Sequence, residues 1–261
     1  MKKTIGIIGG GNMGTALIQA LHKRYRVGVC ETDPRRRTAL AQKFNVKAQD
    51  LQALVHENEI IILAVKPQAM EDVLKEIKDI KGKLFISIAA GLTTRFFAKR
   101  LAKDASIIRT MPNMPAQIGE GITAICRGPN ATTKDIAIAS EILGRVGEVV
   151  VVDERDMDAV TALSGSGPAY VFLFIECLQK SAKVLGLKQD LADPLIRKTL
   201  FGSLKQWQLL KEDPSELRKK VTSKGGTTGA AMKIFLSKKI DHIFQLALVA
   251  AKRRAKTLSK S

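Results

Sequence analysis

Three glycines near the start of the chain have the spacing of a phosphate-binding turn. Gly9, Gly11 and Gly14 follow the apolar segment Thr4–Ile8 and precede apolar residues at helical spacing. In such a strand-to-helix turn, one glycine makes the tight bend, one lets the backbone approach a pyrophosphate, and one lets the helix pack closely. The helix N-terminus then offers unpaired N–H groups and a partial positive charge to the phosphates. A turn without a ligand can have the same glycines, but this position between a strand and a helix favours dinucleotide binding.

A second glycine-rich segment, residues 221–229, reads Val-Thr-Ser-Lys-Gly-Gly-Thr-Thr-Gly. Two adjacent glycines flanked by hydroxyl side chains stand directly before a predicted helix. Such a nest of backbone N–H groups at a helix N-terminus suits an anion. We therefore expect a substrate carboxylate there, with a threonine hydroxyl free to hydrogen-bond a neighbouring heteroatom.

Three shorter motifs lie where predicted strands end or a helix begins. Residues 64–67 (Ala-Val-Lys-Pro) close the third long strand, where Lys66 either contacts a cofactor or is a solvated loop lysine. Residues 109–113 (Arg-Thr-Met-Pro-Asn) offer an amide and soft apolar surface to a nicotinamide ring, or form an ordinary proline turn. Residues 164–168 (Ser-Gly-Ser-Gly-Pro) begin a helix, and their two glycines favour close approach by a ligand or another backbone over simple capping.

The composition of the chain narrows its class. It has 261 residues, 45% of them hydrophobic, which is enough for two domains with sizeable cores. No apolar run reaches the ~20 residues of a membrane span, and three scattered cysteines favour a reducing, cytoplasmic compartment over disulfides. Neither the cysteines nor the three histidines have ligand spacing, so we expect no metal. The net charge of +18 suits anionic ligands, but one tryptophan and two tyrosines supply little stacking surface for bases, so we expect no nucleic-acid or membrane partner.

Strand and helix patterns alternate over roughly the first 150 residues. Continuous Val/Ile/Leu strands separated by helices predict a mostly parallel sheet covered on both faces, which is a doubly wound, Rossmann-type domain; its last strands need not be parallel. Beyond Asp153 only helices are predicted. We therefore expect an α/β fold with a dinucleotide-binding domain over 1–153 and an all-helical substrate-binding and dimerisation domain over 154–261. The predicted strands are Thr4–Ile8, 26–31, 60–65, 84–89, 106–110, 122–126 and 148–152; the predicted helices are 13–23, Pro34–Phe44, 68–77, 94–101, 133–145, 156–163, 168–185, 191–211, 215–221, 229–236 and 241–258.

One predicted helix is apolar around nearly its whole circumference, over residues 169–178. Such a helix must be buried on every side. A small helical domain has little room to bury it alone, so the pattern predicts a homodimer in which a partner subunit provides the cover.

The motifs GGGNMG, AVKP, RTMPN, SGSGPAY and TSKGGTT, in that order, resemble the pyrroline-5-carboxylate reductase family, which catalyses the last step of proline biosynthesis. The resemblance spans Ile5 to about Thr228, and its last motif is the most specific. One departure is visible, because the family usually has Ser-Pro-Gly-Gly where this chain has Ser223-Lys224-Gly225-Gly226. The loss of proline loosens the loop, and Lys224 adds a cation near the expected carboxylate, which bears on substrate affinity and scope.

The resemblance implies an enzyme that reduces 1-pyrroline-5-carboxylate to L-proline by hydride transfer from NADP(H) or NAD(H). Imine reduction needs little acid–base machinery, since the imine can arrive protonated and positioning is the larger part of catalysis. The assembly implied is a homodimer or a ring of dimers. The hydroxyl of Thr228 would reach the imine nitrogen as the catalytic group. The residues expected to hold the cofactor are Ile8, Gly9, Gly10, Gly11, Asn12, Met13, Gly14, Glu31, Ala64, Val65, Lys66, Pro67, Met111, Pro112 and Asn113; those expected to hold the substrate are Ser223, Gly225, Gly226, Thr227 and Thr228.

The choice between the two cofactors stays open in the sequence. Glu31 ends the second strand, where an acidic residue hydrogen-bonds a ribose 2′-OH and repels a 2′-phosphate. Arg35, Arg36 and Arg37 follow closely and could bind that phosphate. Glu31 therefore favours NADH only slightly.

Two other functions are compatible with such a fold. One is reduction of another small imine or hydroxy acid, as in the β-hydroxyacid dehydrogenases, whose catalytic helix needs a buried lysine that residues 170–177 lack. The other is a dinucleotide-sensing regulator that binds DNA, for which no helix-turn-helix pattern is present.

Overall fold

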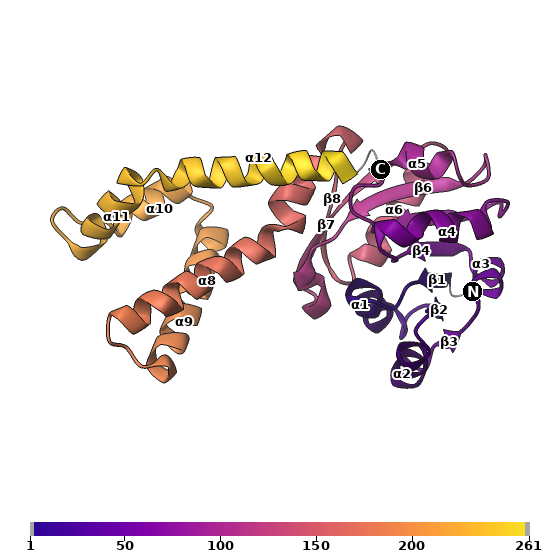
Figure 1. Cartoon of the computed structure of the whole chain (residues 1–261), viewed down its shortest axis with the longest axis horizontal. Helices are drawn as coiled ribbons and strands as arrows, with labels where there is room; N and C mark the ends of the chain where they lie inside the picture. Colours follow the sequence, from indigo (N-terminus) through magenta and orange to yellow (C-terminus); the bar gives the residue numbers. More distant parts are fainter. Residues whose placement is uncertain (1–2, 259–261) are drawn as a thin grey trace. The chain divides into compact units, whose positions relative to one another are not determined.

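The structure is a computed structural model that describes residues 3–258. The chain divides into two compact units. The first contains the residues up to Pro168 together with those from Ala250 onward, and the second is Ala169–Val249. Figure 1 shows that the first unit contains the sheet, whereas the second is built from helices.

One sheet of eight strands runs through the first unit among the described residues (Figure 1). Its order is β3-β2-β1-β4-β5-β6-β7-β8, so the winding reverses direction between β1 and β4. The six strands from β3 through β6 in this order are parallel to one another, β7 is antiparallel to β6, and β8 is parallel to β7. This confirms the predicted doubly wound topology, in which ligands bind outside the carboxyl ends of the strands at the reversal. The strands are β1 Thr4–Ile8, β2 Arg26–Cys30, β3 Lys47–Ala48, β4 Ile60–Leu63, β5 Leu84–Ser87, β6 Ser106–Met111, β7 Gly121–Arg127 and β8 Gly147–Val151.

The helices of this unit largely match the periodicity of the sequence. Several of them begin with an N-cap side chain. Asp33, Thr93 and Thr132 each accept hydrogen bonds from N–H groups of the first helical turn. The sequence pattern missed β3 and α3 because both are too short to show a clear period. The helices are α1 Asn12–Leu21, α2 Pro34–Phe44, α3 Leu51–Glu57, α4 Pro67–Ile77, α5 Thr94–Ala98 and α6 Thr133–Leu143, with a 3₁₀ helix, η1, at Met114–Ile118.

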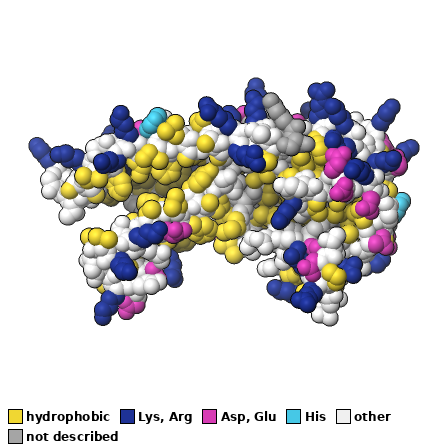
Figure 2. All heavy atoms as spheres, in the orientation of Figure 1, with side chains coloured by type: hydrophobic (Ala, Val, Ile, Leu, Met, Phe, Trp, Pro, Cys, Tyr) yellow, Lys and Arg dark blue, Asp and Glu magenta, His cyan; other side chains and the backbone are white. Residues whose placement is uncertain are grey.

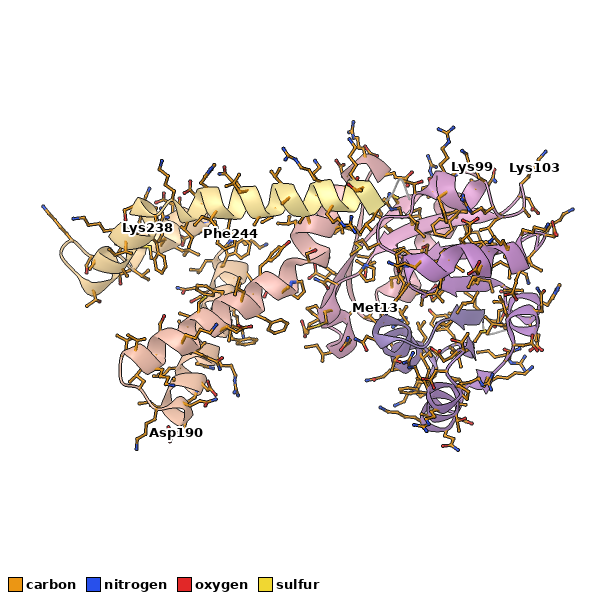
Figure 3. The ribbon with its side chains drawn as sticks, viewed as in Figure 1. Met13, Lys99, Lys103, Asp190, Lys238 and Phe244 are labelled. Atoms are coloured by element: carbon orange, nitrogen blue, oxygen red, sulfur yellow. The ribbon has the colours of Figure 1, made fainter. Side chains whose placement is uncertain are left out.

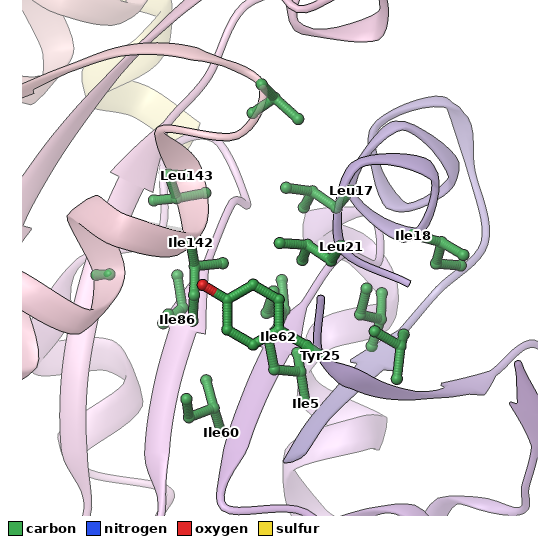
Figure 4. Close-up of a cluster of buried hydrophobic side chains, with 14 of the residues drawn as sticks. Ile5, Leu17, Ile18, Leu21, Tyr25, Ile60, Ile62, Ile86, Ile142 and Leu143 are labelled. Carbon is green, nitrogen blue, oxygen red and sulfur yellow. The ribbon is translucent and has the colours of Figure 1, made fainter. Parts of the chain in front are cut away.

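Strand β4 shows how the sheet is covered on both faces. Ile60 and Ile62 belong to one buried cluster, and Ile61 and Leu63 belong to another. Because successive side chains of a strand point to opposite faces, the two clusters are the cores on the two sides of the sheet. Figure 4 shows the first cluster, where side chains from α1, β1, β4, β5 and α6 meet around Tyr25.

After β8 the described chain is helical to its end, as the sequence predicts. A short 3₁₀ helix and one α-helical turn lead into a π-helical turn, which occupies the first half of the Ser-Gly-Ser-Gly-Pro motif. The elements are η2 Glu154–Asp156, α7 Met157–Val160, η3 Thr161–Gly165, α8 Gly167–Val184, α9 Gln189–Leu210, α10 Pro214–Lys220, α11 Thr227–Ser237 and α12 Ile240–Leu258.

The helices of the second unit bury very little of their own apolar surface. Among residues 169–249, all of which are described, only Ala182 and Ala192 are buried. Phe172 and Phe174 on α8 are 49% and 44% exposed. Figure 2 shows hydrophobic side chains gathered along the helices drawn as α8 and α12 in Figure 1. Leaving such a surface in water costs about 25 cal/mol per Å², so these helices need cover from outside the chain.

One stretch of the described chain, Glu154–Val184, is long and apolar enough to cross a membrane by length and composition alone. Its middle, residues 159–175, has no charged side chain, but serine, threonine, glycine and proline interrupt the apolar residues, which is why the sequence did not single it out as a span. A single stretch of this kind is weak grounds for a membrane, because an apolar helix that protein covers passes the same test.

Candidate active site

The three glycines of the turn after β1 stand in different surroundings. Gly9 has a φ of 103°, and a Cβ there would lie 2.7 Å from the carbonyl oxygen of Ala64, so the tight bend requires glycine. A Cβ on Gly14 would collide with the carbonyl of Gly9, so the close approach of α1 to the turn also requires glycine. Gly11 is different, because its φ is an ordinary −65° and a Cβ would meet nothing within 4 Å. The fold therefore leaves open space at Gly11, where a pyrophosphate would approach.

The N-terminus of α1 has no side-chain cap. Its N-cap residue is Gly11, and no side chain caps it, so the N–H groups of the first turn stay available. The hydroxyl of Thr15 donates to the carbonyl of Gly10 at 2.9 Å and fixes the turn from inside the helix. The sequence analysis did not single out Thr15, although a hydroxyl one turn after a glycine bend is a recognisable signal.

Glu31 lies beneath this turn as well as at the end of β2. Its carboxylate accepts hydrogen bonds from the N–H of Gly10 at 2.7 Å and the N–H of Asp33 at 2.9 Å, and Arg36 lies 3.4 Å away. Burial acts to raise the pKa of Glu31, but the N–H groups of Asp33 and Gly10 and the guanidinium of Arg36 outweigh it and hold that pKa below its usual value. Glu31 is thus ionised at neutral pH and supports the glycine turn directly.

A cleft of about 780 Å³ opens at the carboxyl ends of β1, β4 and β5, where the topology predicts a ligand. Figure 3 labels Met13, on the first turn of α1 at this cleft. Eight of the predicted cofactor residues line it, together with Arg36, which the sequence offers for a 2′-phosphate, and seven residues that the sequence analysis did not name. The predicted ones are Gly10, Gly11, Asn12, Met13, Ala64, Val65, Lys66 and Pro67; the others are Thr15, Ala16, Gln19, Arg36, Ile88, Ala89, Ala90 and Gln117.

The remaining predicted cofactor residues do not line this cleft. Gly9 and Gly14 allow the close backbone contacts of the turn, and the carbonyl of Ile8 accepts from the N–H of Ala64. Glu31 accepts from the N–H of Gly10 within the turn. The segment 111–113 ends β6 and leads into η1, whose Gln117 does line the cleft. The amide of Asn113 is engaged with protein: its Oδ1 accepts from the N–H of Ile122 at 3.0 Å, and its Nδ2 lies 3.5 Å from the hydroxyl of Ser164.

The cleft fits a dinucleotide in its charge as well as its shape. Arg36 and Lys66 line it, and no carboxylate of the described residues 3–258 does. Of the three arginines expected near a 2′-phosphate, Arg36 alone lines the cleft. Lys66 is the N-cap residue of α4, so a second helix N-terminus adds partial positive charge there.

The second glycine-rich segment forms a turn that begins α11. The N–H of Gly226 donates to the carbonyl of Ser223 at 3.1 Å, and Gly225 has a φ of 74°. A four-residue turn with positive φ at its third residue is of type II, which favours glycine there and proline at the second position. Lys224 occupies that second position. A Cβ on Gly226 would displace the hydroxyl of Ser223, so a larger residue there would change the Ser223 side chain rather than the backbone of the turn.

The helix that follows this turn has an uncapped N-terminus at the position where the sequence predicts an anion site. Gly226 is the N-cap residue of α11, and no side chain caps the helix. Thr227 and Thr228 stand in its first turn, and the hydroxyl of Thr228 makes no hydrogen bond within the described residues. By contrast, the hydroxyl of Thr222 donates to the carbonyl of Arg218 at 2.6 Å and is already used. No group of three or more His, Cys, Asp or Glu side chains suited to a metal occurs among the described residues.

Comparison with known proteins matches both parts of the chain. Residues 4–91 match the family model for NADP oxidoreductase, coenzyme F420-dependent, and residues 154–258 match the model for pyrroline-5-carboxylate reductase dimerisation. The pyrroline-5-carboxylate reductases of Haemophilus influenzae and Synechocystis are 35% and 38% identical to the chain. The alignments cover 98% of this chain and 97% of the first relative, and 100% of both chains for the second.

Solved structures agree over the same length. The pyrroline-5-carboxylate reductase of Coxiella burnetii has a TM-score of 0.91 and 35% identity, with 100% of each chain covered. That of Plasmodium falciparum, solved with NADP bound, has a TM-score of 0.88 and 28% identity, and the match covers 99% of this chain and 98% of that one.

The doubly wound sheet with its glycine turn, together with these matches, identifies an NAD(P)-dependent oxidoreductase, and the helical region is a dimerisation domain, so the protein is a homo-oligomer. With full-length relatives above 30% identity, the chain belongs to the pyrroline-5-carboxylate reductase family of proline biosynthesis.

Proposed function

We propose that this chain reduces 1-pyrroline-5-carboxylate to L-proline with hydride from NAD(P)H. The observation that carries the proposal is the pairing, on one chain, of a dinucleotide cleft with a glycine turn that opens an uncapped helix carrying a free threonine hydroxyl. A dinucleotide cleft alone would suit many reductases, whereas the second site suits a small substrate with a carboxylate beside a polar atom.

In this proposal the cofactor lies along the first cleft. The N–H groups at the start of α1 bind the pyrophosphate, and the open space at Gly11 admits it. Segments 64–67 and 88–90 follow β4 and β5 and hold the cofactor on its other side. Ile8, Gly9 and Gly14 serve by shaping the turn, and Met111, Pro112 and Asn113 lie towards the nicotinamide. NAD(P)H supplies the hydride.

The substrate carboxylate is held by the turn at the start of α11. Ser223, Gly225, Gly226 and Thr227 surround it with backbone N–H groups and hydroxyls, and the helix N-terminus adds partial positive charge. The hydroxyl of Thr228 hydrogen-bonds the imine nitrogen and fixes the orientation of the C=N bond. Since the imine can arrive protonated, this placement of the acceptor carbon against the hydride donor is the main catalytic contribution.

The organisation of the chain follows from these roles. We propose a cofactor domain over 1–153 and a substrate-binding and dimerisation domain over 154–261, with the protein acting in the cytoplasm as a homodimer or a ring of dimers. The dimerisation model begins at residue 154, which supports this boundary, while the compact first unit continues to Pro168.

The test is to measure oxidation of NADPH and of NADH by the purified protein with 1-pyrroline-5-carboxylate, and to identify proline as the product. Assays with a small carbonyl compound, and in the reverse direction with the corresponding hydroxy acid, test for another reductase activity. Absence of proline formation with both cofactors, from a protein that binds NADPH, would refute the proposed substrate.

The role of Thr228 has its own prediction. Thr228→Val keeps the shape and the backbone N–H groups but removes the hydroxyl, and one hydrogen bond to a charged group is worth roughly 1.5–3 kcal/mol. We expect kcat/KM for the imine to fall by about one to two orders of magnitude, with NADPH binding unchanged. Thr222→Val is the matched control, because its hydroxyl already donates to Arg218. Full activity of the Thr228 variant would leave the loop as an anion site alone.

A further inference from the structure

The end of β6 presents three residues of one face to the segment that follows β8. Arg109, Met111 and Asn113 alternate along the strand and its extension, so their side chains point the same way. Each meets a residue between 154 and 165. By contrast, Thr110 points to the other face, where its hydroxyl donates to the carbonyl of Ser87 at 3.0 Å.

Arg109 makes the strongest of these contacts. Its side chain is 4% exposed, with Nη1 3.2 Å from Glu154 and Nη2 3.5 Å from Asp158. Glu154 and Asp158 are four residues apart on successive helical turns, so both carboxylates face the same guanidinium. A guanidinium has donors on separate nitrogens and can bridge two carboxylates in this way, whereas a lysine ammonium is a single point of charge.

The carboxylate of Glu154 extends the network to a third element. It accepts from the N–H of Thr94 at 2.7 Å and from its hydroxyl at 2.6 Å. Thr94 is the first residue of α5, where an anion is also favoured by the partial positive charge of the helix N-terminus. The buried charge of Arg109 is therefore matched by two carboxylates, and that of Glu154 is itself hydrogen-bonded, which favours keeping a buried ion pair.

The other two contacts join β6 to the π-helical turn Thr161–Gly165. A Cβ on Gly165 would collide with the terminal methyl of Met111, so these two residues are in direct contact. The amide of Asn113 lies 3.5 Å from the hydroxyl of Ser164. π-helical turns are rare and frequently lie at functional sites. This turn begins directly after α7, which carries Asp158, so the ion pair with Arg109 fixes the base of the turn.

We propose that Arg109 is a positioning residue of the reductase site. Through Asp158 and Glu154 it holds the π-helical turn against the end of β6, and this fixes Met111 and Asn113 beside the cofactor cleft. The cleft is adjacent by chain and by sheet: Gln117 of η1 lines it four residues after Asn113, and β6 pairs with β5, whose end also lines it. The inference rests on the proposed function, because it assigns this segment to the nicotinamide end of the cofactor.

A purely structural ion pair and a positioning pair differ in what their loss changes. The phosphates of NADPH bind at the glycine turn after β1, far along the sheet order from β6, so the dissociation constant should hardly depend on Arg109. Hydride transfer depends on the placement of the nicotinamide, and a misplacement of about 1 Å can cost a hundred-fold in rate. Loss of the positioning contact should therefore lower kcat and leave cofactor affinity unchanged.

The experiment compares Asp158→Asn, Arg109→Lys and Arg109→Gln in the full-length protein. Asp158→Asn keeps the shape of the side chain and the contact between Arg109 and Glu154, so we expect this variant to fold. Arg109→Gln leaves two carboxylates unmatched, and the experiment does not depend on its folding. We expect kcat for imine reduction to fall about ten-fold or more in Asp158→Asn, with the NADPH dissociation constant within two-fold of the parent. Arg109→Lys should retain more activity than Arg109→Gln, because it keeps the charge but cannot bridge both carboxylates.

The matched control is Arg100→Gln. Arg100 also binds a carboxylate, Glu71, at 2.6 Å and packs over the ring of Phe96, but it lies at the other end of α5 and does not line the cofactor cleft. The Arg100→Gln substitution should lower the melting temperature and leave kcat unchanged. Equal kcat for Asp158→Asn and the parent, or an equal loss of kcat in Arg100→Gln, would overturn the proposal.

A second measurement separates this inference from the proposed function. Hydrogen exchange of the amides of 161–165 should speed up in Asp158→Asn and stay unchanged in Arg100→Gln, with NADPH bound and no substrate present. If the parent protein reduces no pyrroline-5-carboxylate, the proposed substrate is wrong, while this exchange pattern still supports the link from Arg109 to the turn. Unchanged exchange in Asp158→Asn would overturn the link itself.

Discussion

The two units of the chain are both rich in apolar side chains but differ in what covers them. In the first, large side chains such as Phe85, Phe97 and Met70 are completely buried by the chain itself. In the second, only Ala182 and Ala192 are buried among residues 169–249, and long apolar helices face outward. Apolar composition thus predicts that a surface will be covered, but not which molecule covers it. The cofactor unit completes its own core, and the helical unit obtains its cover from a second subunit, as its match to a dimerisation domain indicates.

The sharpest way to break this comparison is to place a charge on the uncovered face. Phe172 on α8 is 49% exposed in the single chain. Phe172→Asp should prevent association, because truncating a central aromatic anchor of an interface costs about 2–4 kcal/mol and an unpaired buried carboxylate costs more. Sedimentation should show a monomer at micromolar concentration, imine reduction should be lost, and NADPH should still bind to the first unit. Phe172→Leu, which stays apolar, should remain a dimer.

If the parent protein sediments as a stable, well-folded monomer, the comparison itself is wrong. The exposed helices would then be covered within the chain, and loss of activity in Phe172→Asp would need another cause.

The next largest effect concerns the open space in the cofactor unit. Gly11→Val places a branched side chain where the pyrophosphate must approach, in a position where the protein itself has no atom within 4 Å. The melting temperature should hardly change, whereas the NADPH dissociation constant should rise by about ten- to a hundred-fold, the equivalent of an overpacking cost of about 1–3 kcal/mol. Gly14→Val is the contrast, since its side chain would collide with the carbonyl of Gly9 and should destabilise the fold. An unchanged dissociation constant for Gly11→Val would mean that phosphate binds elsewhere.

The same division between the units decides how much the sequence could reveal. In the cofactor unit, β1 and α2 have the bounds that the sequence predicts, because the apolar runs and the helix start signals are local. The doubly wound order also follows from local patterns, since strand–helix alternation leaves few topologies. The short β3 and α3 were missed because two and seven residues do not establish a period.

For the site, motifs at strand ends were readable but the network behind them was not. The sequence places the RTMPN and SGSGP motifs about fifty residues apart, and only the folded chain shows that Met111 meets Gly165. The role of Glu31 was half readable, since its strand position predicts a ribose contact but not its hydrogen bond to Gly10. Long-range pairings of this kind depend on the tertiary arrangement, which no local pattern encodes.

Glu31 offers a smaller effect that sharpens the account of the cofactor unit. Its carboxylate is ionised, 7% exposed and adjacent to Arg36, so it repels a 2′-phosphate if it faces the ribose. Glu31→Gln should raise the ratio of kcat/KM for NADPH over NADH by about ten-fold, the equivalent of relieving about 1–2 kcal/mol of repulsion in a partly screened site. Glu57→Gln, on an exposed pair with Lys47, is the control and should leave the ratio unchanged. An unchanged ratio in the Glu31 variant would mean that Arg36, and not Glu31, determines the preference between the two cofactors.

The same variant has a readout in acid. A carboxyl whose pKa is lowered by folding contributes stability above its unfolded value, about 4.3, and this contribution is lost as the pH falls through the lower folded pKa. The free energy of unfolding of the parent, measured with denaturant, should therefore fall below about pH 4. Its dependence on pH should be shallower in Glu31→Gln.

The smallest effect is expected at Lys224, in a turn of the helical unit that a backbone hydrogen bond from Gly226 to Ser223 closes. Lys224 occupies the second position of the turn in which Gly225 has positive φ, the position that proline favours. Lys224→Pro should stabilise the protein by about 0.4–1 kcal/mol, because proline restricts the unfolded chain at a φ that the turn already adopts. It should also lower KM for the substrate if a fixed turn holds the carboxylate better. Lys224→Ala removes the same charge without fixing φ, so an equal change in both variants would assign the effect to the cation instead. If the proline variant is less stable than the alanine variant, the turn does not have the type II geometry that starts α11 with the N–H groups of Thr227 and Thr228 free for an anion.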